Sequence, residues 1–495
     1  MTGQAPQDAV ERALRAARCD DCVVIADETS AANLRWAGNT LTTNGVSRSR
    51  RLTVIAISRG ASGTAAGVVS REGARDDQVE DIVREAEKAA SEGSPAPDAR
   101  DLVGPAGPGG LTGPDGLAGP GRVPGQDGTG GQDGGGRQDG APGWDDPARG
   151  TEIGVLGPFA AALKDAFDVA ASGRRALYGY AEHSVTSTFL GTSGGLRLRH
   201  DQPAGNVQLN AKSADLERSA WAGAASRDFT DIDVAAMEAG LARRLDWAAR
   251  RVELPAGRYE TILPPSAAAD LFIYLYWSAG AKDALDGRTV FSKAGGGTRV
   301  GERLAGLPLT LRSDPAAPGL QCAPFVIARA SSRSSSVFDN GLALQPTEWI
   351  SGGELAALTQ TRYSAELSGL PVTPAIGNLI LSAPGATASM PDMIAATGRG
   401  LLVTCLWYIR EVDSQTLLLT GLTRDGVYLV ENGEVTGAVN NFRFNESPVA
   451  MMGRIAEAGV SVPALPREWN DYFTRTAMPP LRVEGFNMSS VSQAS

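Results

Sequence analysis

The sequence predicts an α+β protein of two domains. Three observations support this: amphipathic helices flank strand-like runs in the first half, strand-like runs joined by turn residues dominate the last third, and the helix between them is apolar around most of its circumference. We assign residues 1–232 to an N-terminal antiparallel sheet flanked by helices, 233–258 to a bridging helix and linker, and 259–495 to a C-terminal, mostly β domain around one buried helix.

The N-terminal domain begins with an alternation of helix and strand patterns. The expected elements are a helix marked by Val10, Ala13, Leu14 and Ala17, a strand over 23–26, strands over 34–39 and 52–58, a strand over 63–70, and a helix marked by Val79, Ile82, Val83, Ala86 and Ala90. Asn44-Gly45 is a hairpin signal and is expected to form a turn between the strands over 34–39 and 52–58.

Between residues 91 and 157 the composition changes to Gly, Pro, Asp and Gln. Gln-Asp-Gly recurs at 126–128, 132–134 and 138–140, but glycine does not hold every third position, which excludes a collagen helix. With few apolar side chains the segment cannot offset an ordering cost of about 1–2 kcal/mol per residue. We expect a disordered surface insertion within the N-terminal domain; binding of a partner is the alternative role.

After this insertion a helix over 163–170 leads into an expected antiparallel meander. Its strands are expected over 178–192, 195–200, 205–212 and 217–225. The only two histidines, His183 and His200, fall on different strands and could meet across the sheet. No Cys, Asp or Glu accompanies them at ligand spacing, so two ordinary sheet histidines are the simpler interpretation.

Composition excludes several classes of function. A net charge of −10 and the lack of a basic cluster argue against nucleic-acid binding. The N-terminus lacks a secretory pattern and no apolar run reaches about 18 residues, so a cytoplasmic protein without a membrane span is expected. The four cysteines are too scattered for a disulfide framework; Cys19 and Cys22 form a CxxC that is either a redox or half-zinc pair or, more simply, two reduced thiols.

The C-terminal domain is entered through a helix expected over 233–251 and a strand over 259–263. Two prolines end that strand, and Ser266 is the expected N-cap of a helix that continues to Leu285. Because this helix is apolar on nearly every side, it is expected to be buried.

Further strands are expected over 401–408, 417–419, 427–430 and 435–439. Arg424-Asp425-Gly426 and Asn432-Gly433 are the hairpin signals between them.

Several segments of the second half follow one another in an order similar to that of a known protein family. They are GRTVF (287–291), GERLAGLPLTLRSDP (301–315), VFDNG (337–341), EWISGGELAAL (348–358), TRYSAE (361–366), NLILSAPG (378–385) and the long run 397–448, which contains TGLTRDG and ENG. Together with the strand, proline turn and buried helix before them, they resemble the TldD/PmbA family of two-subunit metallopeptidases. The resemblance is strong from about 259 to 448 and weaker in the first domain.

In that family the zinc-bearing subunit carries HExxxH on the buried helix. This chain has Ala267, Ala268, Ala269, Asp270 and Leu271 there. Only Asp270 could be a ligand, and one carboxylate does not bind a catalytic zinc. The resemblance therefore implies the zinc-free PmbA/TldE-like subunit, with no cofactor in this chain and zinc on a TldD-like partner.

The family is associated with cleavage of small peptides or unfolded segments, and an older label describes modulation of DNA gyrase. The alternative to a heterodimer subunit is a homodimeric, noncatalytic peptide-binding or scaffolding protein. A self-sufficient metalloenzyme is a third hypothesis, which requires zinc in this chain alone.

Polar residues near the end of the chain are the candidate substrate or partner site: Thr423, Arg424, Asp425, Asn440, Asn441 and Arg443. Arg424 could donate paired hydrogen bonds to a carboxylate. The simpler interpretation is that Asp425-Gly426 makes a turn and the asparagines bond their own backbone.

Other catalytic patterns are weaker. The serine run 331–336 has no nearby histidine base, and the glycine-rich 294–303 lacks the GK[ST] ending of a phosphate-binding loop.

Overall fold

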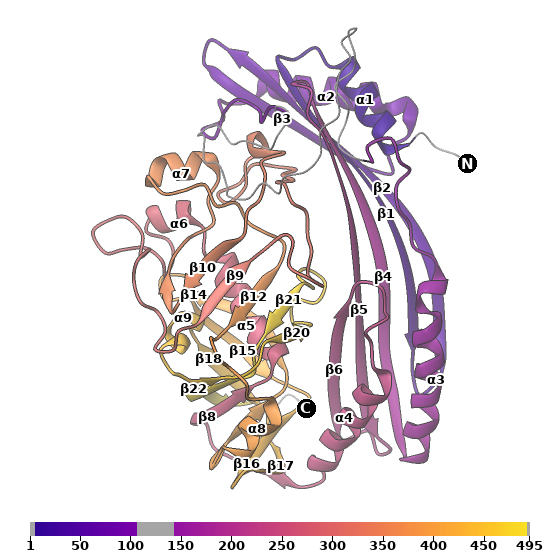
Figure 1. The fold of residues 1–495 in the computed structure, drawn as a ribbon, viewed down its shortest axis with the longest axis vertical. Helices are drawn as coiled ribbons and strands as arrows, with labels where there is room; N and C mark the ends of the chain where they lie inside the picture. The colour runs from indigo at the N-terminus through magenta and orange to yellow at the C-terminus, as the bar shows by residue number, and fades with distance from the viewer. Residues whose placement is uncertain (1–4, 106–142, 493–495) are drawn as a thin grey trace, which may run out of the picture.

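The computed structural model describes residues 5–105 and 143–492. A long curved sheet formed by the N-terminal residues runs along one side of the molecule, and the C-terminal residues pack against its inner side (Figure 1). The predicted α+β class, with an antiparallel N-terminal sheet and a mostly β C-terminal region, is confirmed.

The first sheet is a six-stranded antiparallel sheet in the order β3-β2-β1-β4-β5-β6. Its strands are β1 (Asp21–Trp36), β2 (Leu41–Gly60), β3 (Gly63–Glu72), β4 (Arg175–Thr192), β5 (Arg197–Ser213) and β6 (Ser219–Ser226). The central strand β1 pairs along its whole length with β2 and along 23–36 with β4. Long continuous ladders of this kind account for the elongated shape.

Alternate residues of β1 face opposite sides of the sheet. Cys22 and Val24 pack in one cluster with residues of the outer helices, whereas Val23 and Ile25 pack against Phe338 of the C-terminal domain. The outer helices are α1 (Pro6–Ala16), α2 (Val79–Glu92), α3 (Gly157–Ser172) and α4 (Val234–Trp247). Because both faces are covered at this end, β1 is apolar at consecutive positions.

Four expectations for this sheet are wrong. The runs 23–26 and 34–39, expected as separate strands, lie in or overlap one strand, β1. Asn44-Gly45 lies inside β2, and the turn is formed at residues 37–40, where Gly38 and Asn39 have positive φ. The runs 195–200 and 205–212 belong to one strand, β5. His183 lies opposite Gly205 and His200 opposite Thr188, so the histidines do not meet. Except for the histidines, pairing across the sheet overrode the local turn signals.

Both ends of the predicted insertion belong to the fold. The Ala96 amide donates to the Thr64 carbonyl at 2.8 Å. Trp144 is 7% exposed and packs edge-on against Phe189 with 5.6 Å between ring centroids. Disorder is therefore the wrong expectation for 91–105 and 143–157, where buried contacts supply the ordering energy, while 106–142 lies outside the described residues.

The bridging region divides between the two domains. Helix α4 begins at Val234, with the Asp233 carboxylate capping the Ala236 amide at 2.9 Å, and ends at Trp247, short of the expected residue 251. Its Leu241 and Leu245 are buried in the core of the first sheet. Residues 251–252, by contrast, form β7, which pairs with a strand of the C-terminal domain.

A second sheet, in the order β11-β10-β9-β12-β21-β20, lies between the first sheet and the rest of the C-terminal domain (Figure 1). Its strands are β9 (Thr310–Ser313), β10 (Thr347–Ser351), β11 (Glu354–Leu355), β12 (Leu379–Ser382), β20 (Val462–Ala464) and β21 (Thr476–Met478).

The third sheet has ten strands in the path β14-β15-β18-β22-β8-β13-β16-β17-β7, with β19 beside β22. They are β7 (Arg251–Val252), β8 (Gly257–Leu263), β13 (Arg399–Val403), β14 (Leu406–Asp413), β15 (Leu418–Thr423), β16 (Val427–Glu431), β17 (Glu434–Val439), β18 (Phe442–Glu446), β19 (Ile455–Ala458) and β22 (Leu481–Val491). Since β13 runs directly into β14, these pairings close a ring.

One long hairpin makes this closure. Residues 399–413 pair with 418–431, and both arms bend where the ladder passes from Val403–Val427 to Leu406–Thr423. The predicted hairpin turn at Arg424-Asp425-Gly426 is therefore wrong: it is the bend of one arm, with positive φ at Asp425 and Gly426. The hairpin at Asn432-Gly433 is confirmed, and both residues have positive φ as a type I′ turn requires.

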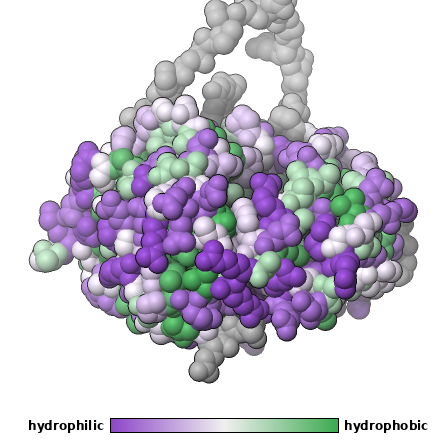
Figure 2. Space-filling view, turned by 90° about the horizontal axis from the view of Figure 1, so that it is seen from below, coloured by the Kyte–Doolittle hydropathy of each residue, from purple (hydrophilic) through white to green (hydrophobic). Residues whose placement is uncertain are grey.

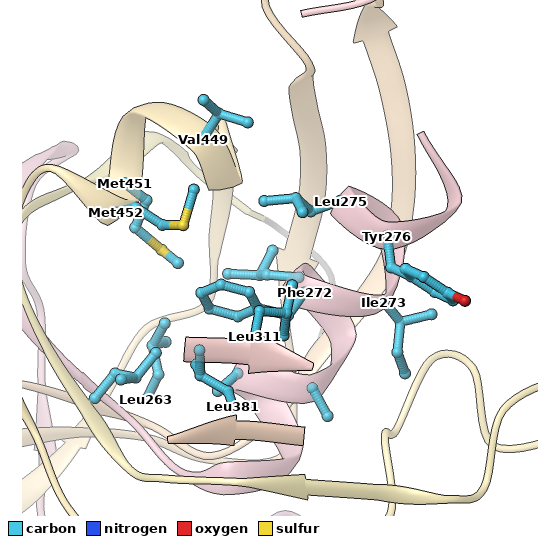
Figure 3. Close-up of a cluster of buried hydrophobic side chains, with 14 of the residues drawn as sticks. Leu263, Phe272, Ile273, Leu275, Tyr276, Leu311, Leu381, Val449, Met451 and Met452 are labelled. Carbon is cyan, nitrogen blue, oxygen red and sulfur yellow. The ribbon is translucent and has the colours of Figure 1, made fainter. Parts of the chain in front are cut away.

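The buried helix α5 (Pro265–Trp277) fills the core between these sheets. Phe272 and Leu275 point toward Met451 and Met452 of α9 and toward Leu311 and Leu381 of the second sheet (Figure 3). Burial of this helix is confirmed.

The limits of this helix differ from the expectation. Pro264 occupies the N-cap position, and Ser266 lies inside the helix. The chain leaves the helix after Trp277, because residues 279–281 exchange backbone hydrogen bonds with Thr359. The remaining helices are α6 (Ala281–Leu285), α7 (Arg362–Ser368), α8 (Met390–Ala395) and α9 (Pro448–Met452), with short 3₁₀ turns at Asp76–Gln78, Ile153–Leu156 and Val337–Asp339.

The surface seen from below is mostly hydrophilic, with small separate hydrophobic patches (Figure 2). Among residues 5–105 and 143–492, no helix is long and apolar enough to cross a membrane.

Candidate functional site

Asp270 is the only carboxylate on α5, and it is fully buried. Its Oδ1 accepts the Glu468 amide at 2.9 Å, and its Oδ2 accepts the Arg467 amide at 3.2 Å. The Trp469 indole donates to the Asp270 carbonyl at 2.9 Å. Burial raises the pKa of Asp270 well above its usual range. This side chain anchors segment 467–469 to the helix.

The neighbours of Asp270 do not fit a zinc site. Ala267, Ala268, Ala269 and Leu271 are at most 1% exposed and belong to the apolar core. Both oxygens of Asp270 are already engaged by backbone amides, so α5 presents no set of donors to a metal. Within the described part of the chain, no group of three His, Cys, Asp or Glu side chains is placed to hold a metal ion.

The two histidines have structural partners. His183 is 5% exposed, with Nδ1 2.7 Å from Thr151 Oγ1 and Nε2 2.7 Å from the Arg227 carbonyl. His200 Nε2 lies 3.1 Å from Gln202 Oε1. Burial lowers the pKa of His200, and the charges of Arg475 and Arg227 lower it further.

The predicted polar turn is built into the bend of the long hairpin. Thr423 is 2% exposed, and its hydroxyl accepts the Phe442 amide at 2.9 Å. Asp425 accepts a hydrogen bond from Ser219 of β6, so it joins the C-terminal domain to the first sheet. Arg424 is about half exposed.

The other predicted residues lie close by but serve separate contacts. Asn440 Oδ1 accepts the Leu254 amide at 2.7 Å. Asn441 Oδ1 lies 3.5 Å from Thr423 Oγ1, which brings these two candidates together. Arg443 donates to Thr420 Oγ1 at 3.2 Å. None of the six candidates lines either of the cavities described next.

An aromatic groove lies at the C-terminal end of α5. It consists of two adjoining hollows of about 580 and 570 Å³, and its aromatic residues are Tyr274, Trp277, Trp407, Tyr408, Trp469 and Tyr472. Trp277 is 44% exposed, Tyr408 56% and Tyr472 76%. Large aromatic side chains exposed together in this way are typical of a binding surface.

A bulge in β14 holds Tyr408 outward. Tyr408 has φ of 56°, and the register shifts between Trp407 and Arg410. The Glu468 carboxylate accepts the Tyr408 amide at 2.9 Å and the Ile409 amide at 3.1 Å, so the bulged backbone stays hydrogen-bonded. Bulges commonly redirect a side chain near functional surfaces.

Sequence reasoning missed this groove because Trp and Tyr in a strand pattern predict core positions. The only available signal was the presence of aromatic residues at the end of the helix and again at 407–408 and 469–472.

A second cavity, which we call the interdomain cleft, separates β5 and β6 from the second sheet. Its volume is about 450 Å³. Pro203 to Gly205, Ala225 to Asp228, Thr230 and Asp231 line one side, and Ala317 to Leu320, Ile380 and Thr474 to Ala477 line the other. Its floor includes the small buried cluster of Ala317, Leu320 and Ile380.

The resemblance seen in the sequence is supported by comparison with known families. Residues 256–490 match the model for the PmbA/TldA metallopeptidase C-terminal domain. The chain belongs to the TldD/PmbA family.

The fold of this TldD/PmbA protein is similar to solved structures over nearly its whole length. The crystal structure of TldE from Thermococcus kodakarensis matches with a TM-score of 0.72 and 15% identity, covering 97% of this chain and 99% of that one. The putative modulator of a DNA gyrase from Thermotoga maritima matches with a TM-score of 0.70, 15% identity, and 97% and 99% coverage. A putative modulator of DNA gyrase from Bacteroides thetaiotaomicron matches with a TM-score of 0.71 and 15% identity, covering 98% of each chain.

Among curated protein sequences, none matches the chain.

Proposed function

We propose that this chain is the zinc-free, TldE-like subunit of a heterodimeric TldD/PmbA-type metallopeptidase that acts on small peptides or unfolded segments. The proposal rests on the environment of Asp270 on α5. Its carboxylate accepts hydrogen bonds from the Arg467 and Glu468 amides, and the residues directly before it on the helix are alanines of the apolar core. In this proposal the zinc and the catalytic base belong to a TldD-like partner, and the complex is cytoplasmic.

The aromatic groove supports a role next to a partner's active centre. It opens beside Trp277, the last residue of α5, and Tyr408 is held toward solvent by the Glu468-stabilised bulge. We propose that the groove forms part of a substrate chamber that the partner completes. Exposed groups of aromatic side chains mark interaction surfaces or ligand-binding grooves.

The test combines the tagged chain with a TldD-like subunit from the same cells. Hydrolysis of an unfolded model peptide is measured with each subunit alone and with both together. We expect hydrolysis only with the pair, and zinc in stoichiometric amount only in the partner. Hydrolysis by the isolated chain, or stoichiometric zinc bound to it, would instead support a self-sufficient metalloenzyme.

Two variants sharpen the test at the groove. Tyr408→Ala removes an exposed ring, and Tyr363→Ala, an aromatic residue outside the groove that stacks with Arg100, is the matched control. We expect Tyr408→Ala to lower hydrolysis by the pair roughly 10-fold, the loss typical of one buried aromatic contact. If the chain forms a stable homodimer and recovers no partner, the noncatalytic scaffolding alternative is favoured.

A further inference from the structure

The interdomain cleft contains two arginines that have no carboxylate partner among the described residues. Arg475 enters it from the second sheet and Arg227 from the loop after β6. A third arginine of the cleft, Arg312, is paired with Asp314 at 3.5 Å. The first two guanidinium groups therefore form no ion pair among the described residues, and they line a cavity whose floor is apolar.

A backbone carbonyl holds the Arg475 side chain in place. Its Nε donates to the Gly377 carbonyl at 2.9 Å. A Cβ at Gly377 would lie 3.3 Å from the Arg475 Nη2, so the missing side chain leaves room for the guanidinium group. Burial lowers the pKa of Arg475, which means that its charge lies in a weakly solvated position. A half-buried cation that has no ion-pair partner attracts an anionic ligand more strongly than a fully exposed one does.

Arg227 approaches the same place from the other domain. It donates to the Gln321 side chain, and Gln202 Nε2 donates to the Gln321 carbonyl at 3.2 Å. Both Arg227 and Arg475 line the cleft, and, in addition to burial, the charge of each lowers the pKa of His200 on β5.

The two acidic residues of the cleft are engaged by their own loop. Asp228 Oδ1 accepts the Thr230 amide at 3.0 Å and its hydroxyl at 2.6 Å, and Asp231 accepts a hydrogen bond from Ser226. Among the described residues, neither carboxylate forms an ion pair with Arg475 or Arg227, although the hydrogen bonds from Thr230 and, to a smaller extent, the charge of Arg227 lower the pKa of Asp228.

We propose that the interdomain cleft binds the C-terminal carboxylate of a peptide. Arg475 and Arg227 donate hydrogen bonds to the carboxylate, and the floor formed by Leu320 and Ile380 receives the side chain of the peptide's last residue. Guanidinium groups match the geometry of a carboxylate, and the apolar floor favours a peptide over a bare anion. This inference rests on the proposed role in handling peptides, but it concerns binding by this chain alone.

The test measures binding of a fluorescently labelled hexapeptide with a C-terminal leucine to the full-length chain without a partner. The same peptide with a C-terminal amide and acetate alone are the comparison ligands. We expect amidation to weaken binding roughly 10- to 100-fold, the range for losing hydrogen bonds to a charged group. Arg475→Gln and Arg227→Gln should each weaken binding of the free-acid peptide, to nearly the affinity that the amidated peptide has for the unchanged protein.

Arg303→Gln is the matched control, because Arg303 also donates only to backbone carbonyls but lies outside the cleft. It should leave binding unchanged. Arg227 is exposed, so its variant tests the site even if Arg475→Gln fails to fold. Equal affinity for acid and amide, no binding of either peptide, or acetate binding as tight as the peptide would each overturn the proposal.

Failure here is distinguishable from failure of the proposed function. Hydrolysis by the heterodimer can persist when free-acid and amidated peptides bind this chain equally, in which case only the carboxylate site is wrong.

Discussion

The two domains of this protein build their sheets in opposite ways. The N-terminal sheet consists of long strands that pair mostly with their neighbours in sequence, such as β1 with β2 over 21–36. The C-terminal sheets join short strands from distant parts of the chain, such as β8 at 257–263 with β22 at 481–491. The first domain therefore depends on repeated local pairing, and the second on a core that long-range contacts hold around α5.

The difference predicts where single substitutions have the largest effect. The C-terminal domain should be the more sensitive to loss of one buried polar contact, because contacts between distant segments, and not pairing of neighbouring strands, hold it together. The following experiments test this in order of decreasing effect.

Asp270→Ala should lower the free energy of unfolding by about 3–5 kcal/mol, since the Arg467 and Glu468 amides lose their acceptors in a buried position. Urea unfolding followed by tryptophan fluorescence measures the change; Trp469 and Trp277 lie beside the affected segment. Asp286→Ala removes an exposed carboxylate of the same domain and should cost less than about 1 kcal/mol.

The cost of Asp270→Ala should also depend on pH. The raised pKa means that the folded protein keeps the Asp270 proton to a higher pH than the unfolded chain does. The contribution of Asp270 to the free energy of unfolding is therefore present at low pH. It declines as the pH rises from the pKa of the unfolded chain through the raised pKa of the folded protein. A cost that grew with pH would contradict the assigned direction.

Asp27→Ala tests the contact between the domains. Asp27 is 7% exposed and accepts hydrogen bonds from Arg329 Nη2 at 2.6 Å and Thr188 at 2.7 Å. Loss of this buried pair should cost about 2–4 kcal/mol. The exposed pair of Arg51 with Glu72 is the control, and Glu72→Ala should change stability by less than about 1 kcal/mol. Equal effects of the two variants would show that the domains do not depend on this contact.

Gly67→Ala tests packing within the N-terminal domain. A Cβ at this position of β3 would lie 2.2 Å from the Ala86 carbonyl oxygen and the Ala90 nitrogen of α2. The backbone of α2 must move, which should cost about 1–3 kcal/mol.

Gly45→Ala is the matched control, because the same atom would meet nothing within 4 Å inside β2. It should leave stability unchanged or raise it by up to about 1 kcal/mol, as expected when glycine is removed from a strand. A similar loss in both variants would contradict the close approach of α2 to β3.

Cys19 gives the smallest effect, a change of reactivity without a change of fold. A hydrogen bond from Cys22 lowers the pKa of Cys19 to about 7, whereas burial raises the pKa of Cys405 to about 12. At pH 7 we expect iodoacetamide to modify Cys19 first, measured by mass spectrometry of peptides. Cys22→Ala removes the hydrogen bond and should slow this reaction roughly 10-fold.

Much of the N-terminal sheet could be predicted because its side chains alternate and its partners are near in sequence. The errors occurred where a local signal lost to sheet pairing, as at Asn44-Gly45, which lies within a 20-residue strand. The buried contacts of Trp144 could not be predicted from a segment of such polar composition.

The candidate sites followed a different pattern. Asp270 was singled out from the sequence, but its role as an anchor for 467–469 depends on residues nearly 200 positions away. The cleft arginines, Arg227 and Arg475, stand 248 positions apart (475 − 227) and have no motif that links them. Tyr408 could not be placed on the surface, because its strand pattern is the same as that of a core residue.

The sequence by itself determined the α+β class, the burial of α5, the family resemblance and the absence of a zinc-binding motif on that helix. Composition, periodicity and short motifs are properties of neighbouring residues, so they can be read without the fold. The tertiary structure was needed to show that the long hairpin closes a ring, that Glu468 supports an exposed Tyr408, and that Arg227 and Arg475 line one cleft. Each of these depends on long-range pairing, where the energy of contact, not local preference, selects the arrangement.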